Sequence, residues 1–96
     1  MTNPKQYLTE PNPTLKRLIY FKAGLNMNQF AIKVGVTRQT IWGLITGRLR
    51  ASPNLAKDIS KALGEDSRVV FSDSQIEYPK IKTAFELLED INNDTN

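Results

Sequence analysis

The chain has 96 residues, a mass of 10.9 kDa and a formal net charge of +3, which is the size of one small domain. It contains no cysteine and no histidine, so disulfide bonds, thiolate metal sites and Ser-His or Cys-His nucleophile pairs are excluded. No apolar run approaches the roughly 20 residues that a membrane helix needs, and the N-terminal segment has no apolar signal core. We therefore expect a cytoplasmic protein that is not an enzyme and uses no metal or cofactor.

Charge is distributed unevenly along the chain. Residues 1–64 carry ten Lys or Arg and two Asp or Glu, a net charge of +8. Residues 65–96 carry three and eight respectively, a net charge of −5. A cationic body followed by an acidic segment is typical of a module that binds a polyanion and carries an appended tail. The alternative, an ordinary charged surface, is disfavoured by the scarcity of acids over the first 64 residues.

The first helix is expected to follow a loose N-terminal arm. Residues 1–12 hold two prolines and no apolar period, so we expect a flexible arm there. Asn12-Pro13 combines an N-cap residue with a proline at the first helical position, which predicts a helix that ends at Gly24. Its apolar positions are Leu15, Leu18, Ile19 and Phe21.

Three further helices are expected before residue 65. Asn26, with Gln29 three residues later, predicts a capping box at the start of the second helix, which Gly35 ends. Thr37 caps a third helix near residues 38–46, which Gly47 ends. The fourth helix runs from the Ser52-Pro53 start signal to the stop at Gly64.

The pattern after Gly64 is weaker. Asp66 can cap a short helical turn, although Val69-Val70-Phe71 fits a strand equally well by propensity. Residues 72–79 have the composition of a linker. Residues 80–91 return to a helical period, with acidic residues opposite an apolar stripe formed by Ile81, Ala84, Phe85, Leu88 and Ile91. We therefore expect an all-α protein with a domain over residues 13–71 and an acidic tail over 72–96 that contains a helix at about 80–91.

The most informative segment runs from Met27 to Gly47. It predicts two short helices joined by a turn, which is the layout of a helix-turn-helix whose second helix enters the major groove of DNA. Ala31 is small where the two helices cross, and Gly35 stands where the turn needs a positive φ. The positions that must face the core are all apolar: Phe30, Val34, Val36, Ile41 and Leu44.

These residues resemble the lambda-repressor-like helix-turn-helix domains, also called the Cro/C1 or XRE type. The resemblance covers about residues 14–71 and rests on Gly24-Leu25-Asn26, Phe30-Ala31, Lys33 to Arg38, Thr40-Ile41, Leu44, Thr46-Gly47-Arg48 and Lys61-Ala62-Leu63-Gly64. It implies a five-helix, all-α DNA-binding domain, here with an extra C-terminal amphipathic helix. The chain departs from the family at Met27, where most members have a glutamine that grips a phosphate, and at Tyr20 and Ile45, where many members have an Arg–Glu pair.

Base contacts are expected from the start of the third helix. Arg38 can grip guanine and Gln39 can grip adenine, each through two hydrogen bonds. Thr37 caps the helix, and a phosphate or thymine-methyl contact would be additional. Trp42 either contacts a thymine methyl or sugar edge, or packs against the arm or the second helix. Gly43 is expected to let the backbone approach DNA closely.

Phosphate contacts are expected on both sides of that helix. At the start of the second helix, backbone N–H groups and the side chains of Asn28 and Gln29 can meet a phosphate. In the loop after the third helix, Thr46, Arg48 and Arg50 can bind phosphates, or can belong to an ordinary solvated loop.

The sequence thus predicts a regulator of transcription that binds specific double-stranded DNA, of the small phage or plasmid repressor or Cro-like type. The 80–91 stripe either folds back on its own domain or pairs with a second copy, and we expect a homodimer because operator-binding relatives commonly occupy two half-sites. The alternative function is an antitoxin or adaptor that uses the same fold and its acidic tail to bind another protein.

Overall fold

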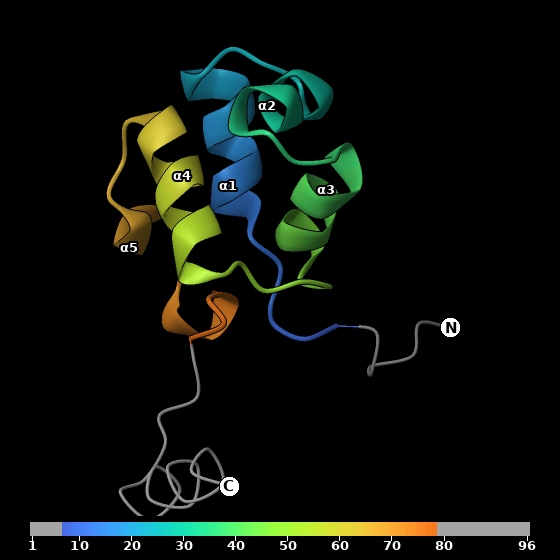
Figure 1. Cartoon of the computed structure of the whole chain (residues 1–96), viewed down its shortest axis with the longest axis vertical. Coiled ribbons are helices and arrows are strands. Elements are labelled where there is room, and N and C mark those ends of the chain that lie inside the picture. Colours follow the sequence, from blue (N-terminus) through green and yellow to red (C-terminus); the bar gives the residue numbers. More distant parts are fainter. Residues whose placement is uncertain (1–6, 79–96) are drawn as a thin grey trace, which may run out of the picture.

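A computed structural model describes residues 7–78 of the chain (Figure 1). The elements are α1 (Pro13–Arg17), the π-helical turn η2 (Leu18–Lys22), α2 (Met27–Val34), α3 (Arg38–Thr46), α4 (Pro53–Leu63), α5 (Ser67–Val70) and the 3-10 turn η3 (Asp73–Gln75). Extended pairing within this range is limited to a single bridge between Ala51 and Ile76. The all-α class is therefore confirmed for the described residues, whereas the helix expected at 80–91 lies outside them.

Local capping signals fix the helix boundaries. The Asn26 side chain accepts from the Gln29 N–H at 2.8 Å while the Gln29 side chain accepts from the Asn26 N–H at 3.0 Å, so the capping box is present. Thr37 caps α3 through the Thr40 N–H, and Ser52 caps α4. Gly35 ends α2 with a φ of 88°, a conformation that glycine adopts without steric cost.

Apolar side chains from every helix meet in one core. In Figure 1, α1 lies centrally, with α4 on one side and α3 on the other. α3 packs against α1 and α2, and α4 packs against α2, η2 and α5. Ala31 is 1% exposed, as expected for a small side chain at the crossing of α2 and α3. The largest fully buried side chains are those of Leu15, Ile19, Phe30, Ile41, Ile59 and Val70.

The first helix differs from its expectation. It changes to π-helical bonding at Leu18, as shown by the bond from the Ala23 N–H to the Leu18 carbonyl at 2.9 Å. Leu15 and Ile19 are buried, but Phe21 is 87% exposed. Phe21 follows Ile19 by two residues, a spacing that points the two side chains to different sides of a helical turn. Phe21 is therefore not a core residue.

Residues 7–12 are not a loose arm, which corrects the expected boundary. The N–H groups of Leu8 and Thr9 donate to the Gly47 carbonyl at 2.8 and 3.0 Å, and the Asn12 N–H donates to the Ile45 carbonyl at 2.7 Å. A side chain at Gly47 would collide with the backbone of Thr9, so glycine is needed for this close approach.

Residues 72–78 are not a linker either. The Gln75 side chain is 7% exposed and donates to the Pro11 carbonyl at 3.2 Å. The Ala51 N–H donates to the Gln75 carbonyl at 2.9 Å. We call the contact among residues 8–12, Arg50 and residues 72–76 the terminal junction. Residues 8–12 bond to Gly47 and Ile45, and residues 72–77 bond to Glu10, Pro11, Arg50 and Ala51, so hydrogen bonds connect both segments to the region that the sequence predicts as the domain.

Candidate nucleic-acid interface

One face of α3 is polar and exposed while the other is in the core. Ile41, Leu44 and Ile45 are buried. Thr37, Arg38, Gln39 and Trp42 are exposed, and Trp42 retains 43% of its accessible surface. The structure therefore brings Arg38, Gln39 and Trp42 together around one hollow, while Thr37 precedes them as the N-cap of α3.

Gly43 does not belong to that exposed face, which corrects its assignment. It is buried beneath the Leu49 side chain, and the Leu49 N–H donates to the Gly43 carbonyl at 3.1 Å. A side chain at position 43 would run into Leu49. The loop after α3 folds back over this turn, so the absence of a side chain at position 43 makes room for Leu49.

The start of α2 lies beside the start of α3. Tyr20, Asn26, Met27, Asn28 and Arg38 line a hollow of about 410 Å³ between η2, α2 and α3. The capping box uses the Gln29 N–H, whereas the N–H groups of Met27 and Asn28 belong to the first turn and have no acceptor within the helix. Asn28 and Arg38 are exposed. A polar hollow with N–H donors and a guanidinium can hold an anion such as a phosphate.

The residues assigned to phosphate contacts have different surroundings in the structure. The Thr46 hydroxyl donates to the Trp42 carbonyl at 2.9 Å, within its own helix. The Arg48 guanidinium lies 5.5 Å from the centre of the Tyr7 ring and remains exposed. Gln29, at the other end of the face, uses its side-chain oxygen in the capping box.

Arg50 is exposed, but its guanidinium is hydrogen-bonded to two other segments of the chain. Its Nη2 donates to the Leu8 carbonyl at 2.7 Å and its Nε donates to the Ser74 carbonyl at 3.1 Å. These bonds connect the two segments of the terminal junction. Arg50 therefore has a hydrogen-bond partner in each of these two segments. Its position in a basic loop predicts a phosphate contact and does not predict these bonds.

Glu10 is the most perturbed titratable group in the described residues. Ser72 and Ser74 donate to its carboxylate at 2.6 to 2.8 Å, and Thr9 donates at 2.7 Å. These hydrogen bonds, with that from Ser72 the strongest, lower the pKa of Glu10 from 4.5 to about 2. The carboxylate is exposed, and the hydrogen bonds that connect the two segments of the terminal junction account for its low pKa. The low pKa is therefore no sign of a catalytic role.

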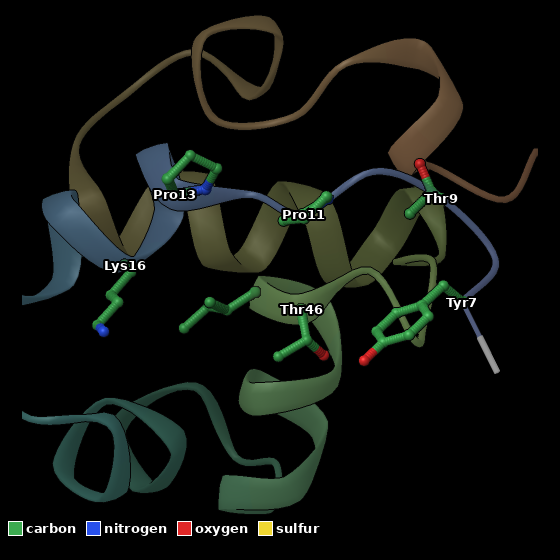
Figure 2. A pocket seen from close by; sticks show the side chains of 7 residues that line it. Tyr7, Thr9, Pro11, Pro13, Lys16 and Thr46 are labelled. Carbon is green, nitrogen blue, oxygen red and sulfur yellow. The ribbon is translucent and has the colours of Figure 1, made fainter. Parts of the chain in front are cut away.

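A second hollow lies at the opposite end of α3 (Figure 2). It has a volume of about 610 Å³ and is lined by Tyr7, Thr9, Pro11, Pro13, Lys16, Ile45 and Thr46. Tyr7 and Thr46 lie side by side at one end, and Lys16 lies at the other (Figure 2). Its lining is mostly apolar and contains no carboxylate and no thiol.

Within residues 7–78, two kinds of feature are absent. No group of three or more acidic side chains is placed to hold a metal ion there. None of the helices in this range is both long enough and apolar enough to cross a membrane.

Sequence reasoning missed the side chains of Tyr20 and Met27, which line the hollows at the start of α2. The sequence marks Met27 as a departure from the family's glutamine and predicts no contact for its side chain. Met27 lines one hollow together with Trp42, which is fifteen residues away in the chain. No local sequence pattern links these two positions.

Comparisons with known proteins give no further guide. No protein-family model matches the chain, and neither curated proteins nor solved structures provide a match.

Proposed function

We propose that the protein is a sequence-specific, double-stranded-DNA-binding regulator of transcription, with the lambda-repressor-like helix-turn-helix fold and α3 as the recognition helix. The observation that carries the proposal is the exposed start of α3. There Arg38 and Gln39, the two side chain types best suited to purine edges, stand beside the first turn of α2. α2, the Gly35 turn and α3 have the order and caps that this motif needs.

Electrostatics support the same proposal. From residue 11 to residue 57 the chain contains eight Lys or Arg and no Asp or Glu. Both α2 and α3 lie within this stretch. A stretch of chain with many cations and no acidic residue of its own attracts the phosphate backbone of DNA over distances of about 10 Å at moderate salt. Binding of this kind needs no catalytic group and no cofactor.

In the proposed mode of binding, α2 contacts the phosphate backbone and α3 contacts the bases. The hollow between Tyr20, Asn28 and Arg38 receives a phosphate at the N-terminus of α2, which fixes the position of the domain on the duplex. Arg38 and Gln39 then reach base edges in the major groove. Arg48, which is exposed at the other end of α3, contacts a second phosphate. The protein acts in the cytoplasm as a homodimer on two half-sites.

Selection of bound duplexes from a random DNA pool tests this function. The full chain should enrich one short motif that includes a purine, and its affinity should fall with rising salt. Enrichment of no motif, with equal and weak binding to all duplexes, would contradict the proposal. That outcome would favour the alternative of a protein-binding adaptor or antitoxin that uses its acidic segment.

A further inference from the structure

An apolar hollow interrupts the polar face of α3. Met27 and Trp42 line it together with Arg38 and Gln39, and its volume is about 350 Å³. Met27 is 8% exposed, so its side chain forms the inner part of the hollow, whereas Trp42 is 43% exposed. A large indole left partly in water beside an apolar floor is unfavourable unless something apolar covers it.

The chemistry of base-pair edges limits what can enter. In the major groove, bases present hydrogen-bond donors and acceptors and one kind of apolar group, the C5-methyl of thymine. A methyl group at C5 of cytosine has the same position and chemistry. Arg38 and Gln39 border the hollow and favour guanine and adenine respectively. An apolar hollow between such side chains suits a C5-methyl pyrimidine that neighbours a purine.

We propose that Met27 and Trp42 form a site for the C5-methyl group of a pyrimidine in the major groove. The inference rests on the proposed function and extends it by naming a base and two residues that select it. Met27, which cannot grip a phosphate as a glutamine does, contributes an apolar surface to base recognition. The bound half-site contains a C5-methyl pyrimidine next to the purine read by Arg38 or Gln39.

The test uses the full chain and the duplex obtained by selection. Each thymine is replaced singly by deoxyuridine, which removes the methyl group and keeps every hydrogen-bonding group. One position per half-site should lose about four-fold in affinity, the effect of burying about one methyl-sized group. At that position, a 5-methylcytosine·guanine pair is compared with a cytosine·guanine pair, and the methylated pair should bind more tightly. Equal affinity of the thymine and 5-methylcytosine duplexes would identify the methyl group alone as the feature that is read.

Variants then assign the effect to the hollow. Trp42→Ala and the nearly isosteric Met27→Gln should bind the thymine and deoxyuridine duplexes equally. Ile32→Ala is the matched control, because Ile32 is an apolar α2 residue that is 73% exposed and does not line the hollow. It should keep the four-fold difference. A role of Trp42 in packing alone would lower stability in thermal unfolding and leave the methyl effect unchanged.

The chain contains one tryptophan, so fluorescence reports on the hollow directly. Emission should shift further to the blue with the thymine duplex than with the deoxyuridine duplex, since the methyl group removes water from the indole. This measurement uses the unmutated protein and does not depend on the variants folding. Selective binding with no deoxyuridine effect at any position would overturn this inference alone. Failure to select any duplex would overturn the proposed function and this inference with it.

Discussion

Arg38 and Gln39 are the residues whose loss should change which DNA the protein binds. Each is exposed at the start of α3, and each can form two hydrogen bonds with a purine edge. Arg38→Ala and Gln39→Ala should each cost about 1–3 kcal/mol of binding free energy on the selected duplex and much less on a scrambled one. Fluorescence anisotropy titrations at constant salt measure both affinities.

Lys57→Ala provides the control for loss of charge, because Lys57 is an exposed cation on α4, away from this face. It should weaken binding to both duplexes slightly and equally. If Arg38→Ala and Gln39→Ala bind the selected duplex as tightly as the parent chain does, the assignment of base reading to α3 is wrong.

At the residue scale, sequence predicted those roles that depend on near neighbours in the chain. The caps at Asn26, Thr37 and Ser52 bond to groups three residues away, so their pattern is visible in the sequence. Gly43 was misplaced because its neighbour, Leu49, belongs to a loop whose path no helical wheel describes. The engagement of Arg50 was missed for a similar reason: both of its acceptors are more than twenty residues away.

At the element scale, the terminal junction should make stability depend on acid pH. Hydrogen bonds from Ser72, Ser74 and Thr9 lower the pKa of Glu10 to about 2 in the folded chain, from 4.5. The stabilisation is therefore complete above pH 4.5 and is lost as the pH falls towards 2. Urea unfolding at several pH values should show the midpoint of Glu10→Gln changing less over this range than that of the parent.

Glu77→Gln is the control for that titration, since the Glu77 side chain lies in the same segment but takes no part in the hydrogen bonds around the Glu10 carboxylate. It should keep the pH dependence of the parent. Identical pH profiles for Glu10→Gln and the parent would show that these hydrogen bonds do not contribute to folding in solution.

Two arginines of the loop after α3 should respond differently to the same substitution. Arg48→Ala should weaken binding to all duplexes and make the plot of log affinity against log salt shallower by about one unit. Arg50→Ala removes two charge-assisted hydrogen bonds to exposed segments and should lower the free energy of unfolding by about 1–2 kcal/mol. Denaturant unfolding and salt titrations separate the two effects. A full unit of salt dependence lost in Arg50→Ala, with unchanged stability, would restore its phosphate role.

The elements themselves were largely predictable, because proline and glycine mark their ends. α3 spans Arg38–Thr46, the range that the sequence indicated, and the segment capped by Asp66 is the helix α5 and not a strand. The segments on either side of the helices were not predictable. Residues 7–12 and 72–78 lack a hydrophobic period, and their order comes from backbone bonds to Gly47, Ile45 and Ala51.

At the scale of the whole molecule, the boundary of the domain determines which truncations fold. A chain that ends at Tyr78 keeps Gln75 and Ile76, which bond to residues 11 and 51, whereas a chain that ends at Ser72 loses them. The first should unfold cooperatively at close to the temperature of the full chain, and the second at a clearly lower one. Equal thermal stability of the two truncated chains would contradict the role of the terminal junction.

Residues 79–96 lie outside the described residues, and we propose a role in self-association from their sequence. A helix of about 12 residues is marginal in water, so the 80–91 stripe must be buried to be helical. Burial of Phe85 and Leu88 can contribute about 1.5–3 kcal/mol each. Sedimentation should show a dimer for the full chain and a monomer for the chain ending at Tyr78. A monomeric full chain, both free and bound to the selected duplex, would contradict this role.

The most direct test of the central claim is an NMR titration of the isotope-labelled full chain with the selected duplex. We expect the largest amide shift changes at the start of α2, residues 26–29, and along the exposed face from Thr37 to Trp42, with smaller changes at Arg48. A scrambled duplex should change the amide shifts mainly at the positions that contact phosphates. Shift changes concentrated on α4 and α5 with α3 unaffected, or the same changes with both duplexes, would contradict recognition of DNA sequence through α3.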